Sequence, residues 1–210
     1  MSQEPDPNDL DGLIRRVDPD RWMSSRFISD AAARADVITL YAFDHELARA
    51  PKVASNPLIG EIRLTWWREV LDEVEASKSV RQHPTALALA DLMQRRGLAR
   101  AGLEALIDAR YRELDAEPMT LDEALTWARE TGGGVAVLAA GLLDPGASAE
   151  AVRSGGTAWA IGRLMRTAGL SGPEAVGALK RERQAARGLS AAAFPAASRM
   201  NSPSTAAPAP

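Results

Sequence analysis

The chain has 210 residues, the size of one ordinary domain, and its net charge of −3 provides no basic field for binding nucleic acid. The absence of cysteine excludes disulfide bonds, a thiolate nucleophile and a cysteine-based zinc site, and two histidines are too few for a histidine-rich metal centre. Residues 1–11 do not resemble a secretory signal, and the longest apolar run, 135–143, is shorter than the roughly 20 residues that span a bilayer. We therefore expect a cytoplasmic protein, with peripheral contact at the inner membrane left open.

Apolar residues recur at helical rather than alternating spacing along the chain, which predicts an all-α fold. The first long helix is expected over 29–50, where Pro51 ends it. Asn56 and Pro57 then have the pattern of a helix N-cap followed by proline at the first helical position. The apolar stripe predicted for this second helix consists of Ile59, Ile62, Trp66 and Val70.

The middle of the chain predicts three more helices. One is expected over 85–96, with Gly97 at its C-terminal cap, and another over 103–114. Thr120 opens a capping box, so a helix should run from there through Leu142. Glycines 132–134 interrupt that helix and indicate either a kink or a close contact with another helix.

The last predicted helices cover 149–168 and 174–187. After Gly188 the composition narrows to alanine, serine and proline, which is typical of disordered segments. The sequence therefore predicts three regions, which are a flexible N-terminus over 1–18, one helical domain over 19–188 and a disordered tail over 189–210.

Two continuous strings stand out within this helical pattern, Leu40-Tyr-Ala-Phe-Asp-His-Glu-Leu-Ala-Arg49 and Glu61-Ile-Arg-Leu-Thr-Trp-Trp-Arg68. Together with 106–115, 120–127 and 132–138 they resemble the squalene/phytoene synthase family. They are most similar to a divergent subgroup of the family, which contains a mitochondrial complex I assembly factor of phytoene synthase descent. The resemblance implies a helical bundle of the isoprenoid synthase type, shortened towards its C-terminus.

Active members of this family carry a D-x-x-x-D pair on each of two helices. Residues at i and i+4 share a helix face, so each pair points at one spot and can hold Mg²⁺ through carboxylate oxygens. Alignment on the Tyr-Ala-Phe and Gly-x-Ala strings places these pairs at Ala48 and Lys52, and at Thr167 and Ser171. None of the four is acidic, so we expect no bound metal, no cofactor and no catalytic residues, and Mg²⁺ only if the chain is an active enzyme after all.

Other side chains that match the family could still bind a ligand or a partner. Arginines can hold a phosphate or carboxylate with two hydrogen bonds, and tyrosine and tryptophan can line a pocket. The candidates are Arg34, Tyr41, Arg63, Trp67, Arg68 and Arg166. The alternative interpretation is structural, with the aromatic rings in the core and the arginines in salt bridges.

We therefore expect a catalytically degenerate family member that acts by binding, with a respiratory complex I assembly intermediate as its partner. Two alternatives remain. One is an active prenyltransferase that condenses prenyl diphosphates, which would need metal-binding acids elsewhere in the chain. The other is a protein that binds an isoprenoid or lipid ligand without chemistry.

Overall fold

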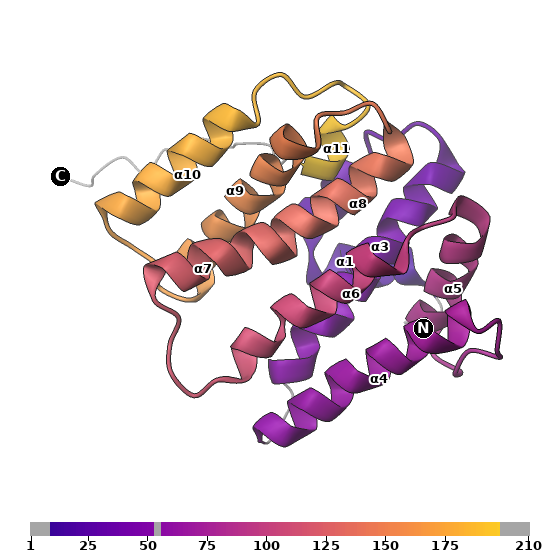
Figure 1. The fold of residues 1–210 in the computed structure, drawn as a ribbon. Helices are drawn as coiled ribbons and strands as arrows, with labels where there is room; N and C mark the ends of the chain where they lie inside the picture. Colours follow the sequence, from indigo (N-terminus) through magenta and orange to yellow (C-terminus); the bar gives the residue numbers. More distant parts are fainter. Residues whose placement is uncertain (1–8, 53–55, 198–210) are drawn as a thin grey trace, which may run out of the picture.

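The computed structural model of the protein describes residues 9–52 and 56–197, and within those ranges it contains helices and no strand (Figure 1). The prediction of an all-α fold is confirmed. The α-helices are α1 (Leu10–Val17), α2 (Pro19–Ser25), α3 (Ala31–Lys52), α4 (Pro57–Glu75), α5 (Pro84–Arg96), α6 (Arg100–Ala109), α7 (Leu121–Ala128), α8 (Gly134–Leu143), α9 (Ala149–Thr167), α10 (Pro173–Ala185) and α11 (Phe194–Ala197). A 3-10 turn, η1 (Tyr111–Leu114), follows α6, and a π-helical turn, η2 (Arg129–Gly133), joins α7 to α8.

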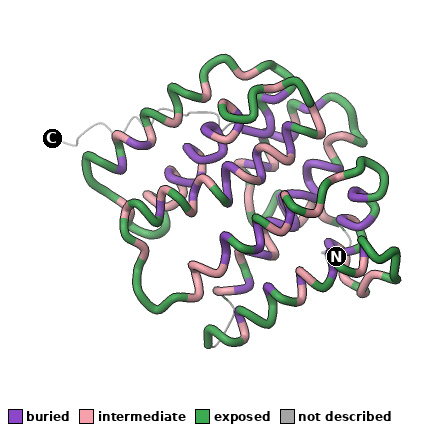
Figure 2. The backbone as a smooth tube through the Cα atoms, in the orientation of Figure 1, coloured by how far each residue is buried: buried purple, intermediate pink, exposed green. Residues whose placement is uncertain are grey.

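Two helices organise the bundle. Helix α3 packs against α1, α4, α5 and α8, whereas α9 packs against α7, α8 and α10. Helices α4 and α10 therefore lie at opposite edges of the molecule (Figure 1). Figure 2 shows the buried positions concentrated on the sides of the helices that face one another. The side chains of Tyr41, Phe43 and Leu47 on α3 are almost completely buried, so α3 is the centre of the core.

The predicted helix ends are confirmed at three places. The Asn56 side chain accepts a hydrogen bond of 3.1 Å from the backbone N–H of Ile59. Gly97 ends α5 in the left-handed conformation, with φ of 62°, which costs glycine little because it has no Cβ. Thr120 and Glu123 form both hydrogen bonds of a capping box at the start of α7.

The expected end of the first long helix is wrong, because α3 continues through Pro51 to Lys52. Proline in the final turn removes only one intrahelical hydrogen bond, so it does not stop the helix at once. The extension matters because it places Lys52 one turn after Ala48, on the same face of α3.

The expected stripe on α4 is correct only in part, because Val70 is fully buried but other members are not. Ile62 is 58 % exposed and Trp66 is half-buried, whereas Leu64, Trp67 and Leu71 face the core. Apolar residues occupy both candidate faces of this helix, so spacing alone could not choose between them. The choice follows from Trp67, whose ring packs edge-on against Phe43 of α3 with centroids 5.3 Å apart.

The expected termini need correction as well. Leu10–Val17 forms α1 with Ile14 fully buried, so the prediction of a flexible segment is wrong for that part of 1–18. Residues 194–197 form α11, whose Ala196 and Ala197 join the core, so part of the predicted disordered tail is ordered. Residues 1–8 and 198–210 lie outside the described residues. No helix among the described residues has the length and apolar character needed to cross a membrane.

The glycine run forms a close helix crossing, as one of the two sequence interpretations expected. A Cβ on Gly132 would lie 2.6 Å from the backbone oxygen of Gly156 in α9, and a Cβ on Gly156 would collide with Gly132 and Ala136. The π-helical turn and α9 therefore touch backbone to backbone. This contact holds α9 against the α7–α8 pair.

We predict that Gly156→Ala lowers the free energy of unfolding by about 1–3 kcal/mol, because its methyl group has no room at the crossing. Gly141→Ala is the matched control, since nothing lies within 4 Å of a Cβ there and α8 continues on both sides. That control should gain about 0.5–1 kcal/mol from the higher helix propensity of alanine. Urea unfolding followed by circular dichroism measures both, and equal stabilities of the two variants would contradict the packing argument.

Candidate functional site

A cavity of about 800 Å³ lies between the C-terminal part of α3, the η1 turn with the loop after it, α7, and the end of α9. The four positions predicted from the sequence to align with the family's metal-binding pairs all line it. Ala48 and Lys52 come from α3, Thr167 is the last residue of α9, and Ser171 follows that helix. The structure thus brings together on one cavity two pairs that are about 120 residues apart in the chain.

The residues at these positions do not fit a magnesium cluster. Mg²⁺ takes oxygen ligands, usually with carboxylates among them, and the four positions offer a methyl group, an ammonium group and two hydroxyls. Among residues 9–52 and 56–197 no three histidine, aspartate or glutamate side chains are grouped so as to hold a metal ion.

Most of the other acids that line the cavity are held by arginines, whereas the Glu117 carboxylate forms no ion pair among the described residues. Arg110 contacts Glu113 at 2.8 Å, Arg112 contacts Asp115 at 3.2 Å, and Asp18 lies 3.6 Å from Arg163. These ion pairs neutralise the carboxylates that a metal would need.

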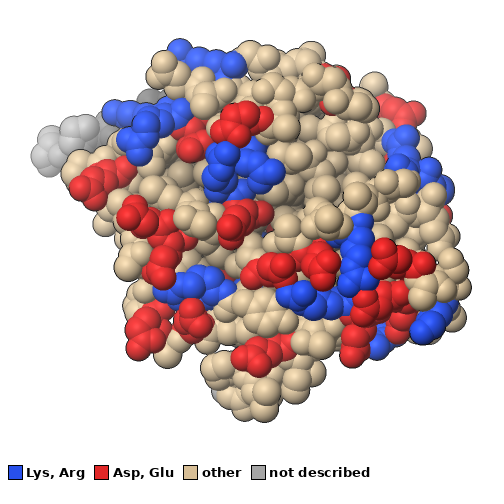
Figure 3. Space-filling model, viewed as in Figure 1, with Lys and Arg blue, Asp and Glu red and all other residues tan. Residues whose placement is uncertain are grey.

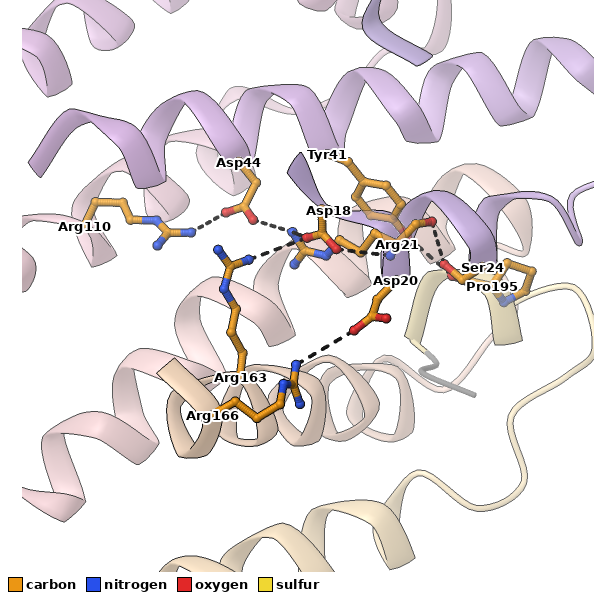
Figure 4. A network of polar contacts seen from close by, with 10 residues as sticks. All are labelled: Asp18, Asp20, Arg21, Ser24, Tyr41, Asp44, Arg110, Arg163, Arg166 and Pro195. Atoms are coloured by element: carbon orange, nitrogen blue, oxygen red, sulfur yellow. Dashed lines mark hydrogen bonds and ion pairs between the residues drawn. The ribbon is translucent and has the colours of Figure 1, made fainter. Parts of the chain in front are cut away.

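Two further ion pairs share the carboxylate of Asp44 and connect three helical segments. Asp44 of α3 accepts one hydrogen bond of 2.5 Å from Arg21 of α2 and another of 2.5 Å from Arg110 at the end of α6 (Figure 4). All three side chains are buried. Burial alone would raise the pKa of Asp44, but the charges of Arg110 and Arg21 outweigh it and hold that pKa at about 2. Asp44 is therefore a fixed anion at neutral pH.

Aromatic rings surround the same arginines. The Arg21 guanidinium lies 3.8 Å from the centroid of the Trp159 ring and 5.1 Å from that of Tyr41, and Arg110 lies 5.3 Å from the Trp127 ring. The Tyr41 hydroxyl donates to the backbone oxygen of Pro195 at 3.3 Å, and burial raises the pKa of Tyr41 to about 12. Tyr41, which lines the cavity, is thus a neutral donor, and Figure 4 shows it beside Arg21, Ser24 and Pro195.

Of the six candidate binding residues, Tyr41 lines the cavity and the others lie outside its wall. Trp67 is a core residue packed on Phe43, as the structural interpretation expected. Arg68 binds Glu104 and Asp108 of α6, so it ties α4 to that helix.

The remaining three candidates are surface or partly buried arginines. Arg34 donates to the backbone oxygen of Ile28 at 2.8 Å, and the Arg63 side chain is exposed on α4. Arg166 donates to the oxygen of Gly162 and lies 3.8 Å from Asp20 (Figure 4). The structure therefore assigns Arg34 a local contact with the backbone and Arg166 contacts within α9 and with α2. Over the face shown in Figure 3, lysine and arginine alternate with aspartate and glutamate rather than gathering by sign.

Sequence reasoning missed the residues that build the cavity's charged wall, chiefly Arg21, Asp44, Arg110 and Arg163. One signal was available, since Arg110 follows Leu103, Leu106 and Ile107 on the buried face of its helix. A charge on a buried face needs a buried partner, but the sequence does not show which of many acids supplies it.

We predict that Asp44→Asn lowers the free energy of unfolding at pH 7 by about 3–5 kcal/mol, because it leaves Arg21 and Arg110 buried without their anion. The depressed pKa of Asp44 also makes the free energy of unfolding depend on pH. A carboxyl whose pKa is depressed in the folded state stabilises the protein above its ordinary value of 3.8 and loses that contribution as the pH falls through about 2.

The pH effect is isolated by comparing wild type with Asp44→Asn in urea unfolding across this acid range. Wild type should lose about 2 kcal/mol more than the variant, which lacks the titrating group. Parallel pH profiles for the two proteins would show that Asp44 is not held as an anion.

The chain matches one protein family and is similar to several known proteins. The model of the family described as squalene/phytoene synthase matches residues 14–171. Among similar proteins are three named NADH dehydrogenase (ubiquinone) complex I, assembly factor 6. The Bos taurus protein is 29% identical over 103 residues and the Homo sapiens protein 28% identical over 103 residues, which is 49% of this chain and 30% of either relative. The Rattus norvegicus protein is 28% identical over 120 residues, covering 57% of this chain and 35% of the relative.

The aligned segments thus span about a third of the length of these relatives. The family match covers well over half of this chain, including α3, α9 and the helices between them that enclose the cavity. The chain therefore belongs to the squalene/phytoene synthase family.

Proposed function

We propose that this protein is a non-catalytic member of the squalene/phytoene synthase family that acts by binding, as an assembly factor for respiratory complex I. The observation that carries the proposal is that the four positions aligned with the family's metal-binding acids share one cavity and hold Ala48, Lys52, Thr167 and Ser171. The family's condensation needs diphosphate to leave, and that step requires strong stabilisation of negative charge by metal ions. Among the described residues, no group of three or more acids and histidines is placed to hold them.

The similar proteins supply the biological context of the proposal. Those described above are complex I assembly factors by name, and each aligns with about half of this chain. An assembly factor needs a stable surface or pocket and no turnover. The buried ion pairs and the glycine crossing provide a stable framework without any metal.

Deleting the gene in the organism that encodes this chain tests the role in assembly. We expect loss of fully assembled complex I on native gels and of NADH:ubiquinone activity, with succinate dehydrogenase unchanged as the internal control. Wild-type chain and Lys78→Ala, an exposed lysine outside the cavity, should both restore assembly. Normal complex I in the deletion strain would refute the assembly role.

A separate assay tests the non-catalytic half of the proposal. The purified chain is incubated with farnesyl or geranylgeranyl diphosphate and Mg²⁺, and organic extracts are examined for condensed product and the solution for released diphosphate. We expect neither to exceed the level of a protein-free control, because the described residues contain no group of three or more acids and histidines placed to hold a metal ion. Condensed product that forms only in the presence of the protein would show that the chain is an active prenyltransferase.

A further inference from the structure

Lys52 differs from the other cations that line the cavity. Arg21, Arg110, Arg112 and Arg163 each contact at least one acid within 4 Å. In the part of the chain that the structure describes, Lys52 forms no hydrogen bond or ion pair. Lys52 is exposed and also lines the cavity of about 800 Å³, so its ammonium group is accessible to a ligand there.

The surroundings of Lys52 favour an added negative charge. Desolvation lowers its pKa, and the charges of Arg163 and Arg110 lower it further. Glu113 and Asp44 oppose this, but their carboxylates are already bound by Arg110 and, for Asp44, by Arg21 as well. Repulsion among like charges at this end of the cavity is relieved when an anion enters.

Neighbouring groups have donors available for such an anion. The guanidinium of Arg163 lies 3.6 Å from Asp18, an ion pair without a direct hydrogen bond, so its N–H groups remain able to donate to a ligand. Ser171 adds an exposed hydroxyl to the same wall. Two further donors of lining residues, Arg110 Nε and Trp159 Nε1, lack an acceptor among the described residues. These two donors are buried, so Lys52, Arg163 and Ser171 are the groups of this wall that can reach a ligand, with Glu117 as an acid on the same wall.

We propose that Lys52 and Arg163 bind a phosphate-type anion in this cavity directly, without a divalent cation between the anion and the protein. The inference rests on the proposed loss of catalysis and names a ligand class for the same site. Lysine is well suited to it, because its ammonium group acts as a compact point charge towards phosphate oxygens. At a position aligned with a metal-binding acid, the chain thus carries the positive charge itself.

Calorimetric titration of the full chain with inorganic diphosphate tests this directly, once in EDTA and once with Mg²⁺. We expect binding in EDTA that Mg²⁺ does not strengthen. Lys52→Ala should weaken it by roughly 10-fold or more, the usual effect of removing a charged hydrogen-bonding partner. Arg163→Ala should weaken it similarly, whereas Lys78→Ala should bind like wild type. Thermal unfolding of each variant checks that it is folded.

Three outcomes would overturn the proposal. They are absence of binding in EDTA, binding that appears only with Mg²⁺, and folded Lys52→Ala that binds as tightly as wild type.

A phosphate group can belong to a soluble molecule or to a lipid head group, and vesicles separate the two sources. Phosphatidylcholine vesicles with and without phosphatidic acid are sedimented with wild type and Lys52→Ala. Binding that requires phosphatidic acid and Lys52, and that diphosphate reverses, assigns the site to a lipid head group. Diphosphate binding without vesicle binding assigns it to a soluble phosphate. Vesicle binding that survives Lys52→Ala excludes this cavity as the lipid site.

This inference and the assembly role fail separately. Diphosphate binding together with normal complex I in the deletion strain would refute the role in assembly and leave the anion site standing. Loss of complex I together with absence of diphosphate binding would keep the role and remove the site.

Discussion

The buried ion pairs of Asp44 with Arg21 and Arg110 are the interaction on which the rest of the bundle depends. They connect α2, α3 and the end of α6, which are distant in sequence. Two arginines cannot be buried beside one another without an intervening anion, because their desolvation and mutual repulsion are both unfavourable. Asp44 therefore fixes where α2 and α6 lie against α3. Those positions, in turn, determine that Trp159 and Tyr41 enclose the Arg21 guanidinium.

The same ion pairs explain why the cavity has a charged wall although the described residues contain no cluster of acids placed to hold a metal ion. Its arginines use the acids beside them, so those carboxylates stabilise the fold and are not available to coordinate a cation. Residues at the four aligned positions take no part in these ion pairs, nor in the crossing of Gly132 with Gly156. The contacts that build the cavity are consequently independent of Ala48, Lys52, Thr167 and Ser171, the positions predicted to align with the family's metal-binding pairs.

Local patterns predicted much of the fold and less of the site. The Asn56 cap, the left-handed Gly97 and the Thr120 capping box depend on residues within one turn, so the sequence could place those helix ends. The buried face of α4 could not be chosen, because apolar residues cover two faces and only the position of Phe43 favours Trp67 over Trp66. The resemblance to the family selected four positions, and the structure places all four on one cavity. The partners of Arg110 and Arg21 stayed hidden, because a salt bridge between distant segments has no sequence signal.

Pro51 and Lys52 show how one local detail decides what the cavity can bind. Had α3 ended at Ala50, the direction of the Lys52 side chain would not be fixed relative to Ala48. Because the helix continues one residue past the proline, Lys52 lies at i+4 from Ala48, the spacing at which two side chains share a face. The i, i+4 spacing that would place two carboxylates around a metal ion here places a methyl group and an ammonium group on the wall of the cavity. An ammonium group there repels a metal ion and attracts the anion that the metal would otherwise hold. On the predicted alignment, a lysine at this position would alter the ligand preference of the cavity in one step, whereas Ala48 would only remove a ligand.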